Sequence, residues 1–219
     1  SIVFAFPSLG RAAALAALKL VLDRRRPLEE VLATPDIASA LDALEPRDRG
    51  FAIALVRTCL RRLGDIDHRL SQLMDHALPA RSGTALHILR LGAADLLFLR
   101  TSAHACVNSA VELSGRDPKA RHFSGLINAV LRRLAAAPES PQAEHELNLL
   151  PDWLSESWRR HYGPLADDIV RAHLIEPALD LTLKPELDLY LWAERLGAHI
   201  LPTGSLRLVR AGPIAALAG

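Results

Sequence analysis

The chain has 219 residues, half of them hydrophobic and only 5% aromatic, which favours a helical domain of ordinary size with a smaller companion over a β-sandwich. Its net charge of +1 conceals an asymmetry, because residues 1–136 carry 19 Lys and Arg against 13 Asp and Glu, whereas residues 137–219 carry 7 against 12. Two cysteines exclude a disulfide framework, and Pro7, Gly10 and Lys19 interrupt the apolar N-terminal run, so we expect a cytoplasmic protein without a membrane span.

Apolar residues at helical spacing, separated by proline and glycine, predict a series of helices in the first part of the chain. The predicted helices cover about residues 9–25, 27–33, 35–44, 46–78, 84–99, 104–115 and 119–136. We expect Gly64 to divide the longest stretch in two, with Asp65 capping the second helix. Residues 84–99 are apolar nearly all round, which predicts a central, fully buried helix.

The second part of the chain begins with a proline-rich, polar stretch over residues 137–150, which is typical of a linker. Two helices are expected after it, and then the apolar pattern changes from helical spacing to strict alternation, which is typical of half-buried strands. The predicted elements are helices at 152–162, 165–174 and 187–197 and strands within 179–184, 198–203 and 205–210. Gly204 indicates a hairpin turn rather than a phosphate loop, because a strand follows it.

Two nine-residue segments, "LVRTCLRRL" at 55–63 and "LINAVLRRL" at 126–134, share the pattern L-[VI]-x-x-x-L-R-R-L. One interpretation is a duplicated helical subdomain. The other is that amphipathic helices ending in arginine resemble one another, because basic residues favour the C-terminal end of the helix dipole. The sequence leaves both interpretations open.

No catalytic or metal site is predicted from the residues. Cys59 and Cys106 lie in apolar helical patterns and are expected to pack in the core, and the nine histidines lack the spacing of metal ligands. What remains is arginine, which makes up 23 of the 26 basic residues and suits bidentate phosphate contacts, although a GC-rich genome also encodes arginine in excess. The predicted RNA-contacting residues are Arg11, Arg24, Arg25, Arg57, Arg61, Lys119, Arg121, Arg132 and Arg133.

The segment "FSGLINAVLRRL" at 123–134 carries two rows of side chains at helical spacing. The predicted core row is Ile127, Val130, Leu131 and Leu134, and the polar row is Arg121, Gly125, Asn128 and Arg132. We expect Gly125 to allow close approach of a neighbouring helix and Asn128 to hydrogen-bond across that contact. Arg132 and Arg133 diverge by about 100° around a helix, so at most one of them is expected to face RNA.

Several ordered blocks resemble the NusB-type helical RNA-binding domain, in the form that opens bacterial ribosomal RNA 5-methylcytosine methyltransferases of the RsmB (Fmu, Sun) type. These blocks are "GRAAALAALKLVL", "DRGFAIALVRTCLRRLGDIDHRL", "ILRLGAADLLFL", "HACVNSAVEL" and "GLINAVLRRL". Residues 150–163, 176–184 and 192–219 resemble the segment that such enzymes place before their catalytic domain.

The resemblance implies a mainly α fold with a NusB-like all-helical bundle of two helical subdomains over residues 1–136. A linker at 137–150 and a region of helices plus a small α+β subdomain at 151–219 would follow, ahead of a Rossmann-like methyltransferase domain. The family transfers a methyl group from S-adenosylmethionine to C5 of cytosine with two cysteines from later motifs, which this chain lacks. Thr58 and Cys59 fall within a NusB-like helix and do not correspond to the family's Thr-Cys motif.

The resemblance therefore implies a chain without catalytic, cofactor-binding or metal-binding residues, inactive alone, with S-adenosylmethionine implied for the catalytic domain. The leading hypothesis is an RNA-binding N-terminal region that positions small-subunit (16S) rRNA for the methyltransferase. One alternative is a stand-alone NusB-like antitermination module that engages RNA with a ribosomal protein, and another is a helical protein-interaction module. NusB-like domains can pair, so a dimer is compatible with the resemblance.

Overall fold

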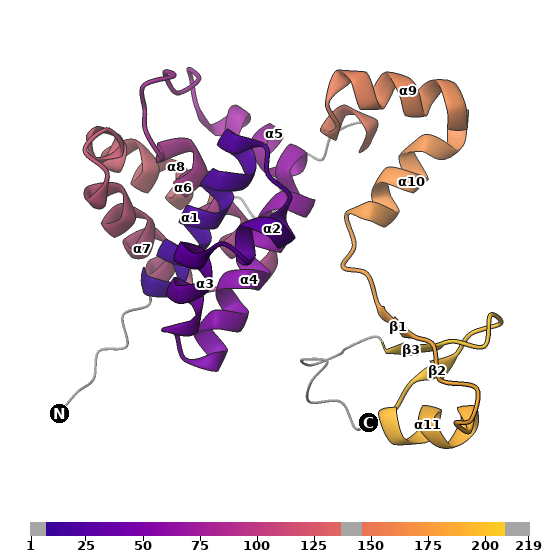
Figure 1. Ribbon diagram of the computed structural model, residues 1–219. Helices are drawn as coiled ribbons and strands as arrows, with labels where there is room; N and C mark the ends of the chain where they lie inside the picture. Colours follow the sequence, from indigo (N-terminus) through magenta and orange to yellow (C-terminus); the bar gives the residue numbers. More distant parts are fainter. Residues whose placement is uncertain (1–7, 137–145, 209–219) are drawn as a thin grey trace. The chain divides into compact units, whose positions relative to one another are not determined.

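The structure is a computed structural model, described here for residues 8–136 and 146–208. Its first part is a bundle of helices (Figure 1). The helices of this bundle are α1 (Ser8–Arg24), α2 (Leu28–Leu32), α3 (Pro35–Asp42), α4 (Pro46–Arg61), α5 (Leu63–Leu73), α6 (Ala85–Ala94), the π-helix η1 (Asp95–Leu99), α7 (Ala103–Arg116), the 3-10 helix η2 (Ala120–Phe123) and α8 (Ser124–Ala136). The mainly α fold and its order of helices confirm the prediction.

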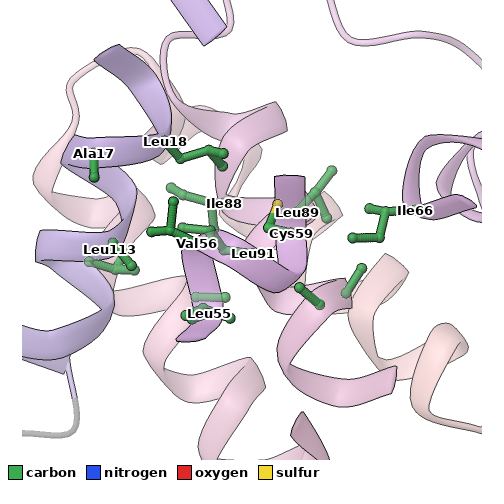
Figure 2. Close-up of a cluster of buried hydrophobic side chains, with 14 of the residues drawn as sticks. Ala17, Leu18, Leu55, Val56, Cys59, Ile66, Ile88, Leu89, Leu91 and Leu113 are labelled. Carbon is green, nitrogen blue, oxygen red and sulfur yellow. The ribbon is translucent and has the colours of Figure 1, made fainter. Parts of the chain in front are cut away.

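Helix α6 forms the centre of the bundle, as predicted. It packs against α1, α4, α5, α7 and α8, and Ile88 and Leu89 are at most 1% exposed. Figure 2 shows Ile88 near Leu18 of α1 and Val56 of α4, and Leu89 near Cys59 of α4. A helix that contacts neighbours on every side needs apolar residues nearly all round, and the polar side chains of this helix, His87 and Arg90, are paired with Asp23 and Asp67.

The two cysteines are core residues, which confirms the prediction. Cys59 and Cys106 are 0% and 1% exposed. The Cys106 thiol donates to the carbonyl oxygen of Gly92 at 3.4 Å. Burial, which disfavours the thiolate, raises the pKa of each thiol to about 12. Both side chains therefore behave as small apolar groups.

The junction between α4 and α5 differs from the prediction. The helices meet at Arg62, and Gly64 lies inside α5. Asp65 is therefore not the helix cap. It is buried in the first turn, where it accepts from Arg69 at 2.7 Å and pairs with Arg62 at 3.6 Å. Asp65 therefore forms ion pairs with side chains three and four positions away, the spacing that favours such pairs on a helix.

The core row of α8 is confirmed, because Ile127, Val130, Leu131 and Leu134 are at most 1% exposed. The predicted close approach at Gly125 is wrong, since a Cβ atom built there meets no other atom within 4 Å. The close approach is made instead by Gly92 of α6, where a Cβ would lie 2.7 Å from Cδ1 of Leu131. The glycine that admits the neighbouring helix thus lies on α6.

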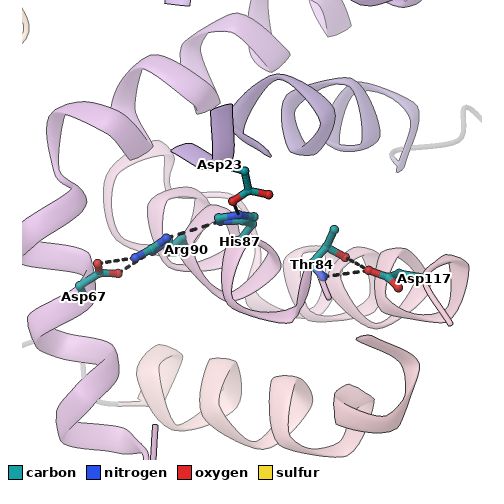
Figure 3. Close-up of polar contacts among 6 residues, drawn as sticks. All are labelled: Asp23, Asp67, Thr84, His87, Arg90 and Asp117. Carbon is teal, nitrogen blue, oxygen red and sulfur yellow. Dashed lines mark hydrogen bonds and ion pairs between the residues drawn. The ribbon is translucent and has the colours of Figure 1, made fainter. Parts of the chain in front are cut away.

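Polar contacts join α1, α5, α6 and α7 around the start of α6 (Figure 3). His87 and Asp23 lie 2.9 Å apart, and Arg90 donates both to its neighbour Asp67 at 2.7 Å and toward His87 at 3.5 Å. Asp117 accepts at 2.8 Å from both the backbone N–H and the hydroxyl of Thr84. These contacts link α6 to α1, α5 and α7 in addition to the apolar packing.

Residues after the bundle form a second set of helices followed by a small sheet. Its elements are η3 (Glu146–Leu149), α9 (Asp152–Tyr162), η4 (Gly163–Leu165), α10 (Ala166–His173), β1 (Leu179–Leu181), α11 (Leu189–Leu196), β2 (His199–Ile200) and β3 (Leu206–Leu208). The strands are antiparallel in the order β1-β3-β2, and Arg207 is opposite both Asp180 and His199. The hairpin at Gly204, with φ of +80°, is confirmed.

The chain divides into two compact units, Ser1–Val170 and Arg171–Gly219. The predicted linker at 137–150 is largely outside the described residues, and the helical residues 146–170 group with the bundle rather than with the α+β subdomain. Gly64 of α5 provides a physical reason, because a Cβ there would lie 1.8 Å from the carbonyl oxygen of Leu149. The backbone of η3 therefore approaches α5 at a distance that only glycine permits.

Candidate nucleic-acid interface

Arg11, grouped above with the predicted RNA contacts, lies in the core instead. Arg11 is 8% exposed. Its Nε and Nη2 donate to Oδ2 of Asp95 at 2.9 and 2.7 Å. The guanidinium also stacks on the ring of Phe51, 4.8 Å from the centroid. A buried carboxylate needs such a partner, so Arg11 serves the contact between α1 and the end of α6.

Four predicted cations belong to α1, α4 and the turn after α1. Arg24, Arg25 and Arg57 are exposed, and Arg61 is half-buried. Arg57 donates to Glu29 at 3.1 Å in an exposed pair of small energetic value. Within the described part of the chain, the other three side chains make no ion pair. Arg25 has a φ of +52°, a left-handed conformation unusual for arginine.

A surface groove lies between α7 and α8, and two members of the polar row, Gly125 and Asn128, line it. The groove has a volume of about 500 Å³ and is lined by Asn108, Val111, Glu112, Ser124, Gly125 and Asn128. The hydroxyls of Ser114 and Ser124, 2.7 Å apart, join the two helices beside it. Because Gly125 has no side chain, it leaves the groove open, which is the role that the sequence did not predict for it.

The predicted cations of this region are exposed beside the groove. Arg132 donates from Nε to Oδ1 of Asn128 at 3.0 Å, within α8 and not across a helix contact as predicted. Arg121, in η2, makes no side-chain ion pair among the described residues, and neither does Lys119. Arg121 and Arg132 are 11 positions apart, roughly 16 Å along a helix axis. The single carboxylate of the lining, Glu112, pairs with Arg116.

Arg133 has a separate environment, as the helical geometry predicts. Its Nη1 donates to the carbonyl oxygen of Leu73, the last residue of α5, at 3.4 Å. A cation at a helix C-terminus satisfies free carbonyl groups and complements the dipole. Arg132 therefore lies beside the groove, bonded to the lining residue Asn128, whereas Arg133 belongs to the contact with α5.

Arg47 and Arg100 are among the exposed cations that the sequence did not single out. Arg100 follows η1 in a left-handed conformation, with φ of +55°. The sequence signal for an exposed Arg100 was its position directly after the long apolar segment 84–99, because a charged residue at the end of a buried helix usually reaches solvent. Among the described residues, no cluster of potential metal ligands is found, and no helix is long and apolar enough to cross a membrane.

The class of protein is defined by the all-helical bundle, which has a surface groove between α7 and α8 and exposed arginines beside it. The NusB family model matches residues 9–136, and the chain therefore belongs to the NusB family. Two solved structures support the fold. One is a chain of the "Crystal Structure of a Plectonemic RNA Supercoil", with 20% identity and a TM-score of 0.53 over 61% of this chain and 96% of that chain. The other is a chain of the "Crystal Structure of Antitermination Factors NusB and NusE in complex with dsRNA", with 20% identity and a TM-score of 0.50 over 59% of this chain and 96% of that chain.

The similar curated proteins are ribosomal RNA small subunit methyltransferases B. The protein from Thermus thermophilus is 40% identical over 162 residues, covering 67% of this chain and 36% of its own length. The protein from Xanthomonas campestris is 33% identical, and the match covers 73% of this chain and 35% of that protein. The protein from Escherichia coli is 25% identical, and the match covers 79% of this chain and 40% of that protein. This chain thus spans little more than a third of these relatives, and a match over 79% of it extends beyond the NusB region at 9–136.

Proposed function

We propose that this chain is the RNA-binding N-terminal region of an S-adenosylmethionine-dependent rRNA (cytosine-C5) methyltransferase, and that it binds and positions small-subunit rRNA. The observation that carries the proposal is the extent of the similarity. Relatives named as small-subunit rRNA methyltransferases match this chain beyond residue 136, whereas the NusB family model ends there. A shared NusB domain alone does not account for that extent.

The groove between α7 and α8 supplies groups suited to RNA. Arg121 and Arg132 carry positive charge that carboxylates of the lining do not cancel, because Glu112 is paired with Arg116. Guanidinium groups contact phosphate, and the amide groups of Asn108 and Asn128 can hydrogen-bond to base edges and ribose hydroxyls. The open backbone at Gly125 lets a strand approach the helix. The groove thus combines groups that can contact RNA phosphates with groups that can recognise bases.

The experiment is a binding titration of the chain against a small-subunit rRNA fragment at two salt concentrations. Charge reversal by Arg121→Glu with Arg132→Glu removes two phosphate contacts, so we expect affinity to fall on the order of 10- to 100-fold and the salt slope to decrease by about 1.4 for a single strand. Arg160→Glu, an exposed arginine of α9, is the matched control. Unchanged affinity in the double variant, or no binding by the wild type, would contradict the proposal.

The chemistry of methyl transfer is assigned to the remainder of the longer relatives. Its cysteine nucleophile needs an accessible thiolate, and both thiols here are buried with pKa values near 12. The described residues therefore do not fit the catalytic role, and we derive no step of the transfer from them. A methylation assay with this chain alone is expected to transfer no methyl label to rRNA.

A second candidate is a stand-alone antitermination module, favoured by the structural likeness to NusB. It makes a different prediction, namely that the chain binds NusE and antiterminator RNA more tightly than small-subunit rRNA. Competition between the two RNAs in one titration, with and without NusE, separates the candidates. Preference for antiterminator RNA would favour this second candidate over the methyltransferase.

The third candidate, a helical protein-interaction module, predicts arginines that only solvate the fold. Charge reversal at Arg121 and Arg132 would then change neither RNA affinity nor its salt dependence. The same titration therefore separates this candidate from the first two.

A further inference from the structure

A second pocket lies away from the groove and shares no lining residue with it. It has a volume of about 220 Å³ and is lined by Gly10, Arg11, Arg47, Asp48, Phe51 and Thr101. These residues come from the first turn of α1, the first half of α4 and the segment just before α7. The pocket thus collects residues from parts of the sequence that lie far apart, so the sequence alone did not reveal it.

One lining residue of the pocket, Arg11, is buried. Arg11 is held by two hydrogen bonds to Asp95 and by the Phe51 ring. Because Asp95 balances its charge, Arg11 contributes hydrogen-bonding surface and not net charge. The accessible positive charge comes from Arg47, which lines the pocket, and from Arg100, whose neighbour Thr101 lines it. Within the described part of the chain, neither side chain has an ion-pair partner.

The backbone at Arg100 has an unusual conformation. It is left-handed, with φ of +55° and ψ of +35°, which glycine adopts freely and arginine adopts only at a steric cost. The N–H of Arg100 and that of Thr101 both donate to the carbonyl oxygen of Asp95, which holds this turn in place. Folding stability alone would favour glycine at this position. The exposed guanidinium is therefore the feature that arginine adds here.

We propose that Arg47 and Arg100 bind a phosphate group of RNA at this pocket, as a second contact apart from the groove. Two guanidinium groups and the Thr101 hydroxyl are suitable donors to phosphate oxygens. The pocket opens at the first turns of α1 and α4, where helix dipoles favour an anion. The negative charge of Asp48 disfavours a second phosphate in the pocket, and its carboxylate can accept a hydrogen bond from a ribose 2′-hydroxyl. This inference rests on the proposed function, since RNA is its ligand.

The test uses the full chain and the same rRNA fragment. Arg47→Ala with Arg100→Ala should weaken binding about 10-fold and lower the salt slope by roughly 0.7, as expected when one phosphate of a single strand is no longer neutralised. Arg100→Gly should weaken binding as much as Arg100→Ala does and should not lower the melting temperature, because glycine suits the left-handed conformation. Arg160→Ala is the matched control, and a thermal melt of each variant verifies folding.

The outcomes distinguish this inference from the proposed function. Binding that depends on Arg121 and Arg132 but is unchanged in the Arg47 and Arg100 variants overturns the pocket and leaves the groove standing. Failure of the wild type to bind RNA overturns both. If Arg100→Gly raises the melting temperature with no loss of affinity, Arg100 is only a strained helix end, and its role in binding is refuted.

Discussion

Replacing Asp95 by alanine should be among the most damaging single changes in the bundle. Asp95 is 1% exposed, and its Oδ2 accepts two hydrogen bonds from Arg11, which is itself 8% exposed. Asp95→Ala leaves a buried guanidinium without its counter-ion, a change that costs about 3–5 kcal/mol. Domains of this kind have a free energy of unfolding of about 5–15 kcal/mol. We therefore expect a variant that has lost a large part of its stability.

The measurement is urea unfolding followed by circular dichroism, with the m-value checked for two-state behaviour. The matched control is Asp95→Leu combined with Arg11→Met, which removes both charges and fills the same space. Because replacing a whole buried ion pair by apolar residues is often close to neutral, the double variant should be clearly more stable than Asp95→Ala. A loss below about 1 kcal/mol in Asp95→Ala would show that the pair is effectively solvated and would refute the reasoning.

Three further predictions concern other parts of the described chain. Gly64→Ala should displace the Leu149 carbonyl and speed hydrogen exchange in η3, whereas Gly115→Ala, where a Cβ meets nothing within 4 Å, should not. Burial raises the pKa of Asp117, but hydrogen bonds from Lys119 and Thr84 outweigh it and lower the pKa from 3.8 to about 2. Its stabilisation is therefore full above pH 4 and lost as pH falls toward 2, and acid titration of Asp117→Asn should lack that step. Both thiols should resist a thiol reagent at pH 8 until the protein is unfolded.

Local patterns predicted the helices, strands and core rows because each depends on residues near one another in the sequence. Tertiary contacts account for the errors. Arg11 and Asp95 are 84 positions apart, so nothing in either segment reveals that one neutralises the other. The glycine that admits α8 is Gly92, and the pattern around Gly125 is equally compatible with an open groove. A glycine in a sequence shows where close approach is allowed, and only packing shows where it occurs.

The repeated pattern at 55–63 and 126–134 shows the same limit. Leu55 is fully buried, but Leu126, at the corresponding place, is 37% exposed. Equivalent letters therefore face different surroundings in α4 and α8. The shared arginines likewise differ, because Arg62 stacks on Phe98 at 4.7 Å while Arg133 donates to Leu73. The pattern alone does not establish equivalent positions in two subdomains.

The groove and the pocket together predict how their contributions combine. They share no lining residue, and contributions of sites without common partners are usually additive in free energy. The four-fold variant carries both pairs of substitutions. If one RNA strand contacts both sites, the factors by which each pair lowers RNA affinity should multiply in this variant, and the two decreases in salt slope should add. If the sites bind separate RNA molecules, removing the pocket should lower the number of RNA molecules bound per chain and leave the affinity of the groove unchanged. The four-fold variant thus separates one extended interface from two independent ones.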